Sequence, residues 1–105
     1  MTEQAALQES YNDLGRAIGD LVETFAIPHT KTCMRWGKPT REAYRAEVVN
    51  WLRDYSKSFA RLPKKGLPGQ PDLPTFASER LEAEIGLVLG GRNPAVERSY
   101  THLFG

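Results

Sequence analysis

The sequence predicts an all-α fold, a compact bundle of about four helices (two long and two short) with a long proline-rich connection. Three observations predict it. Apolar residues recur at spacings of three and four along four segments, capping residues or prolines mark their boundaries, and residues 63–74 hold four prolines and two glycines. At 105 residues, the chain (1–105) is expected to form one domain. The alternative is an α+β fold with a small sheet from residues 30–36 and 85–89.

The first segment predicts a helix from about Glu3 to Ala26, ended by Pro28, which cannot continue a helix. Gly15 and Gly19 form a smooth shoulder beside its apolar stripe, which predicts that a second helix packs closely there. The stripe itself indicates an intramolecular core, with the seam of a homodimer as the alternative. Its members are Leu7, Tyr11, Leu14, Ile18, Leu21 and Phe25.

The second segment predicts the most amphipathic helix, from Arg41 to about Leu62. Thr40 is expected to cap it and Pro63 to end it. Before it, residues 29–38 lack periodicity and are expected to form a loop or a short strand. The apolar residues of this helix are Tyr44, Val48, Trp51, Leu52, Tyr55, Phe59 and Leu62.

Residues 63–74 are expected to form a loop inside the domain, because the 31 residues beyond it are too few for a core of their own. Thr75 is expected to cap the third helix, and Gly90 and Gly91 to end it. The pair Asn93-Pro94 predicts the start of the fourth helix. The residues expected to be buried are Leu14, Ile18, Leu21, Val48, Leu52, Tyr55 and Ile85.

No catalytic or metal site is predicted. A catalytic site needs a nucleophile, a base within reach and a group that orients the base. The chain offers only His29, His102 and Cys33, too few for a structural zinc site, and it has no glycine-rich phosphate loop. We therefore expect a non-enzymatic protein without a cofactor.

The chain is expected to be cytoplasmic and not to enter a membrane. No apolar run approaches the roughly 20 residues that cross a bilayer. The first residues lack the basic start and apolar stretch of a secretory signal. A single cysteine, Cys33, cannot form an internal disulfide.

The net charge of +1 conceals a strong segregation along the chain. Residues 1–30 have a balance of −4, residues 31–65 a balance of +7, and residues 66–105 a balance of −2. Extended cationic tracks bind phosphates without reading sequence. The basic middle segment therefore predicts a small regulatory protein that binds nucleic acid, or an acidic protein surface, through Arg35, Trp36, Lys38, Arg41, Arg45, Arg53, Lys57, Arg61, Lys64 and Lys65.

Two other interpretations of the same residues remain open. The basic residues could be a solvated face neutralised by local ion pairs and by the acidic ends of the chain. Alternatively, the protein could be an inhibitor or adaptor that binds a larger protein at fixed stoichiometry through a helix face or the proline-rich loop. Nucleic-acid binding predicts a steep dependence on salt, whereas protein binding predicts hot spots at aromatic residues such as Trp36.

Overall fold

The computed structural model describes residues 2–34 and 37–105, and within these ranges all regular structure is helical. The α-helices are α1 (Glu3–Leu21), α2 (Ile27–Cys33), α3 (Arg41–Ser56), α4 (Leu73–Leu89) and α5 (Pro94–Phe104). A π-helical turn, η1 (Val22–Ala26), joins α1 to α2, and a 3-10 turn, η2 (Lys57–Arg61), extends α3. The predicted all-α bundle is confirmed. The alternative with a sheet is wrong for the described residues, because 30–33 and 85–89 are helical.

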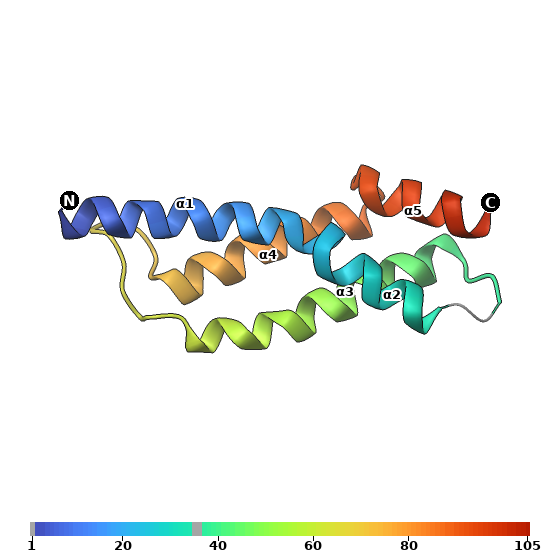
Figure 1. Cartoon of the computed structure of the whole chain (residues 1–105), viewed down its shortest axis with the longest axis horizontal. Coiled ribbons are helices and arrows are strands. Elements are labelled where there is room, and N and C mark those ends of the chain that lie inside the picture. The colour runs from blue at the N-terminus through green and yellow to red at the C-terminus, as the bar shows by residue number, and fades with distance from the viewer. Residues whose placement is uncertain (1, 35–36) are drawn as a thin grey trace.

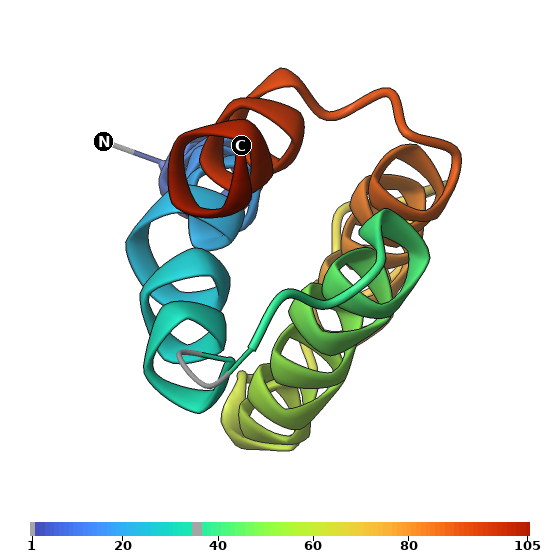
Figure 2. The same ribbon diagram turned by 90° about the vertical axis from the view of Figure 1, so that its right-hand side faces the viewer.

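The helices form two layers, with α1, α2 and α5 in one and α3 and α4 in the other (Figure 2). The molecule is elongated, measuring 52 × 22 × 20 Å. α1 lies along α4, whereas the short α2 covers only the beginning of α3 (Figure 1). The second half of α3 and the turn η2 therefore extend beyond the cover that α2 provides.

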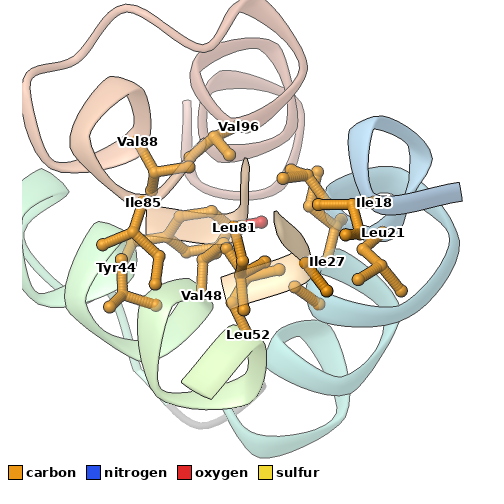
Figure 3. Packing of buried hydrophobic residues seen from close by; sticks show 14 of the residues in the cluster. Ile18, Leu21, Ile27, Tyr44, Val48, Leu52, Leu81, Ile85, Val88 and Val96 are labelled. Atoms are coloured by element: carbon orange, nitrogen blue, oxygen red, sulfur yellow. The ribbon is translucent and has the colours of Figure 1, made fainter. Parts of the chain in front are cut away.

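The core fills the space between the two layers (Figure 3). Five of the residues expected to be buried are buried: Ile18, Leu21, Val48, Leu52 and Ile85. The expected burial was wrong for the other two residues, because Leu14 is only half-buried and Tyr55 is 37% exposed. The reason is geometric, because Tyr55 lies in the second half of α3, which α2 does not cover. Tyr44, Leu81, Val88 and Val96 complete the centre of the core.

Pro28 does not end the first helix as predicted, because η1 lets the chain pass it without a break. A proline in a regular α-helix lacks an amide hydrogen, and its ring collides with the carbonyl group four residues earlier. In η1 the turn is widened, and the amide of Ile27 donates to the carbonyl of Val22, five residues back. The extra residue also keeps Ile27 and Thr30 buried in line with the apolar stripe of α1.

The structure confirms two of the three predicted helix caps and corrects the third. Thr40 accepts from the amide of Ala43 at 3.0 Å, and Asn93 accepts from that of Val96 at 3.1 Å. Thr75, expected to be a cap, instead donates its amide to Asp72 at 2.9 Å, so α4 begins three residues earlier than predicted. The earlier start brings Leu73 into the helix and buries it.

The α-helical part of α3 is also shorter than predicted. It ends at Ser56, and η2 takes over as far as Arg61, with Leu62 donating its amide to the carbonyl of Phe59. The side chains of Ser56 and Ser58 donate to backbone carbonyls three residues earlier. Such bonds compete with the regular helical pattern and accompany the tighter turn.

The hydroxyl of Tyr11 holds the proline-rich connection against α1. It donates to the carbonyl of Pro71 and accepts from the amide of Leu67 at 3.3 Å. A side chain at Gly66 would not fit, because its Cβ would lie 3.0 Å from both the Tyr11 oxygen and the backbone of Asp72. The connection is therefore an ordered crossover pinned to the N-terminal helix.

We expect Gly15→Ala to raise the free energy of unfolding by about 0.5–1 kcal/mol, because alanine favours the helix and costs the unfolded chain entropy. Side chains of α4 lie over the glycine shoulder, as predicted, but an added Cβ at Gly15 would lie 3.8 Å from Phe76 Cζ, an ordinary contact. Urea unfolding measures the change. Gly66→Ala is the control and should destabilise; a loss of stability with Gly15→Ala would contradict the prediction.

Candidate functional site

The first two arginines of α3 bind α5, so they fasten the fold together. Arg45 donates to both carboxylate oxygens of Glu97, with Nε 3.0 Å from Oε2 and Nη2 2.7 Å from Oε1. Arg41 Nη1 lies 3.2 Å from the same Oε1, and its guanidinium lies 4.5 Å from the centre of the Tyr100 ring. Gly91, at φ +72°, passes so close that a Cβ would lie 2.8 Å from Arg45 Nη2. We call Arg41, Arg45 and Glu97 the clamp.

The clamp makes stability depend on pH, and Glu97→Gln should reduce that dependence. The hydrogen bonds from Arg45 hold the pKa of Glu97 below its ordinary value of 4.5. A carboxyl whose pKa is lower in the folded state stabilises fully above its unfolded pKa and loses that effect as the pH falls through the folded pKa. Below about pH 4.5, the parent should therefore lose stability more steeply than Glu97→Gln.

At neutral pH, Glu97→Gln should cost roughly 1–2 kcal/mol, because a partly buried charged hydrogen-bond acceptor is lost. Thermal unfolding from pH 3 to pH 7 measures both effects. Glu79→Gln on the exposed side of α4 controls for the change in net charge. Parallel pH profiles of the parent and Glu97→Gln would contradict the role of the clamp.

The next two basic residues along the chain, Arg53 of α3 and Lys57 of η2, are paired with nearby acids at the surface. Arg53 Nη1 lies 2.8 Å from Glu82 Oε1 of α4, and Lys57 Nζ lies 3.4 Å from Asp54 Oδ1. All four side chains are more than half exposed, so these pairs stabilise the fold little. They do, however, lower the positive potential along the middle of α3.

The remaining basic residues of the predicted binding surface lie at opposite ends of α3. Lys38 precedes the helix, whereas Arg61, Lys64 and Lys65 follow it, and the intervening 20-odd residues of helix are roughly 30 Å long. Within residues 2–34 and 37–105, these four form no ion pair. Arg35 and Trp36 lie outside the described residues. The structure thus brings together only Arg61, Lys64 and Lys65, which we call the basic end.

Aromatic residues join the π-turn and α2 to α3. The ring of His29 lies 4.2 Å from that of Phe25 and 4.6 Å from that of Trp51, and Phe25 lies 5.0 Å from Tyr55. His29 Nδ1 is 2.8 Å from the carbonyl oxygen of Phe25. His29 therefore packs α2 onto α3, while Cys33, one turn later on α2, is exposed.

Two hollows follow one another along α1, opposite the end of α3, η2 and the start of the proline-rich connection. We call the two hollows together the α1–η2 groove. Its first part is a hollow of about 110 Å³, lined by Leu14, Ala17, Ile18 and Leu21 of α1 and by Tyr55, Ser58, Phe59 and Leu62. Its second part is a hollow of about 230 Å³ further along α1, lined by Glu3, Ala6, Leu7, Ser10, Pro63, Lys65 and Leu73.

The two parts of the groove differ in polarity. The first part has apolar walls, with Tyr55 exposed at its rim and only Ser58 polar. The second part reaches the basic end, since Lys65 lines it and Lys64 and Arg61 are exposed neighbours in the chain. Glu3 is the one acidic residue among the residues that line the two hollows. The groove is therefore apolar in its middle and basic at one end.

The spacing of the leucines in α1 is a signal for this groove in the sequence, although the apolar residues of α1 were predicted to form a single stripe. Leu7, Leu14 and Leu21 are spaced by seven residues, whereas Tyr11 and Ile18 lie on the neighbouring edge of the helix. Tyr11 and Ile18 are buried, while Leu7 and Leu14 remain half-buried in the groove. The first helix therefore has two apolar edges, one for the core and one for the groove.

The stripe proposed as a homodimer seam is used largely inside the chain, because Tyr11, Ile18 and Leu21 are buried there. Among the described residues, no helix is both long and apolar enough to cross a membrane, and no group of three metal-ligating side chains occurs. Comparisons with protein-family models, curated proteins and solved structures gave no significant match.

Proposed function

We propose that this chain is a non-enzymatic protein-binding module, an inhibitor or adaptor whose contact surface is the α1–η2 groove. The observation that supports the proposal is the apolar lining of the first part of this groove, where Ser58 is the one polar residue among those that line it. Helix faces and grooves of this kind are common sites of protein recognition, with exposed aromatic residues as anchors. Tyr55, 37% exposed at the rim, is such an anchor.

The ion pairs also favour a protein partner over a polyanion. Four of the basic residues expected to bind phosphates, Arg41, Arg45, Arg53 and Lys57, already bind carboxylates of this chain. Neutralised cations release few counterions from nucleic acid, and counterion release supplies most non-specific affinity. We place the binding in the cytosol, where an exposed thiol such as Cys33 stays reduced.

Blocking the groove tests this function. Ala17 is exposed and lines the groove, so Ala17→Glu adds bulk and charge there without removing a core side chain. Ala83→Glu makes the same change at an exposed position of α4 outside both hollows. Tagged parent and variants are used for capture from the native host after nuclease treatment, and each captured protein is then purified and titrated calorimetrically.

We expect one protein to bind the parent and Ala83→Glu at a fixed stoichiometry, and its affinity for Ala17→Glu to fall at least about tenfold. Circular dichroism of the variants checks that the fold is retained. Equal affinity of Ala17→Glu and the parent for every captured protein would contradict the proposal.

Polyanion binding is a second candidate, favoured by the three exposed cations of the basic end. Three phosphates neutralised on duplex DNA give a log–log slope of affinity against salt of at most about −2.7. Mobility shift at low salt should detect binding that is lost when Arg61, Lys64 and Lys65 are changed to glutamate. Ala17→Glu should leave such binding nearly unchanged, which separates this candidate from the first.

A further inference from the structure

We propose that the α1–η2 groove accepts one amphipathic helix of another protein, and that this helix carries acidic residues at one end. This inference rests on the proposed protein-binding function and names the kind of partner. Three features of the groove carry it: the long helical wall formed by α1, the apolar lining of its first part, and its basic end.

The wall that α1 provides to the groove is about five helical turns long. One wall is α1 from Glu3 to Leu21, and the other is the end of α3 with η2 and the start of the proline-rich connection. Eighteen residues of helix correspond to about 27 Å. A partner helix in the groove would lie over the end of α3 in the same way as α2 lies over its beginning (Figure 1). It would thus continue the same layer.

A helix fits the lining better than an extended peptide. An extended segment gains affinity by pairing its backbone with an open sheet edge, and the described residues contain no strand. Neither wall offers an edge, because both are helical turns or a connection held by its own bonds. A helix satisfies its own backbone and presents only side chains, which is what apolar walls of Leu14, Leu21 and Leu62 require.

The charges around the groove specify acidic residues on the partner. The basic end holds Arg61, Lys64 and Lys65, which are exposed and have no ion pair within residues 2–34 and 37–105. Glu3 is the only acid that lines the groove. Asp72 lies near enough to Lys64 to offset part of its charge. Acidic side chains near the end of a partner helix would still meet a net positive charge, which favours the encounter and sets the direction of binding.

A second copy of this chain is a poorer occupant than another protein. Apart from Tyr55 at the groove itself, the large apolar side chains that are well exposed in the described residues are Leu87, Leu89 and Leu103. They lie near the ends of α4 and α5, not along one face of a helix. The apolar faces of α1 and α3 already pack into the core of their own chain.

Designed peptides test the occupant directly. The reference probe is a peptide of about 18 residues, the length of the groove at 1.5 Å per residue. It has leucine at helical spacing on one face and three glutamates at one end. A second peptide has lysines in place of the glutamates, and a third keeps the glutamates but has serine in place of every leucine. Binding to the full chain is followed by fluorescence anisotropy.

We expect the acidic amphipathic peptide to bind roughly tenfold to a hundredfold more tightly than the lysine peptide, since about three exposed charge pairs are exchanged for repulsion. Reversal of Arg61, Lys64 and Lys65 to glutamate should invert this preference. Reversal of Lys31, Arg92 and Arg98, exposed elsewhere, is the matched control and should not. Ala17→Glu should abolish binding of the acidic peptide, whereas Ala83→Glu should not.

Several results would overturn the inference. The serine peptide binding as tightly as the leucine peptide would indicate a site for polyanions. Binding that survives Ala17→Glu would place the peptide elsewhere, and no binding at concentrations up to about 100 µM would exclude a helix of this type. Sedimentation showing a dimer that Ala17→Glu dissociates would make a second copy the occupant.

The inference and the proposed function fail in different ways. The function fails when no host protein depends on the groove in the Ala17→Glu comparison. The inference alone fails when a host protein does depend on the groove, but the lysine peptide displaces that protein as effectively as the acidic peptide does.

Discussion

Leu52→Ala is expected to lower the free energy of unfolding by about 2–5 kcal/mol. Leu52 is completely buried on α3 and lies between the two layers, among the side chains of Val48 and Leu81 (Figure 3). Truncation removes apolar contacts and leaves a cavity that rigid neighbouring helices cannot fill. Since domains of this size are stable by about 5–15 kcal/mol, the loss would be a large part of the total.

Urea unfolding followed by circular dichroism measures this loss. Leu87→Ala makes the same chemical change at a position that is 40% exposed, so its effect should stay within about 0.5 kcal/mol. Equal losses for the two variants would mean that the space around Leu52 is not the tightly packed centre of the core.

Deletion of Thr24 from η1 is expected to destabilise the protein by at least about 3 kcal/mol. Without the extra residue, α2 would turn by about 100° relative to α1, which carries Ile27 and Thr30 away from the core. Pro28 would then meet a regular α-helix, where its ring collides with a preceding carbonyl group. Thermal unfolding of the deletion variant gives the size of the effect.

Thr24→Ala is the control for the deletion, because it keeps the length of the turn. It removes only an exposed side chain, which donates to the carbonyl of Asp20, and should change stability by less than about 0.5 kcal/mol. A deletion variant as stable as Thr24→Ala would show that the π-turn can be absorbed without loss.

The sequence predicts those parts of the fold that local interactions decide. Thr40 and Asn93 are predicted to be caps because each is a good capping residue that precedes an amphipathic segment. In the structure, each accepts from the amide three residues later. The predicted start of α4 is three residues late because Asp72 and Thr75 are both good caps, and the burial of Leu73 favours the earlier start. Pro28 was expected to stop the helix because the local rule does not include a π-turn.

The candidate site depended more on interactions between distant residues. The charge of the middle segment is evident in the sequence, but Arg45 and its partner Glu97 are 52 residues apart, and Arg53 and Glu82 are 29 apart. No local pattern reveals such pairs. The groove has a trace in the seven-residue spacing of Leu7, Leu14 and Leu21. That spacing does not by itself predict the groove, because it does not show that α4 covers only the other edge of α1.

The place of α1 in the structure also has a consequence for the order in which the chain assembles. α1 leaves the ribosome before α4, yet Tyr11 packs against Phe76 and Gly19 lies beside Arg80, 61–65 residues later in the chain. Each doubling of the length of a closed loop raises the entropic cost of closure by about 0.6 kcal/mol. Closing these loops therefore costs about 2 kcal/mol more than closing an eight-residue turn. α3 and α4 are closer in the chain, with residues 57–72 between them, so their pairing closes a smaller loop at a lower cost. α1 is therefore expected to dock after α3 and α4 have paired, with its apolar edges exposed on the nascent chain until α4 has emerged.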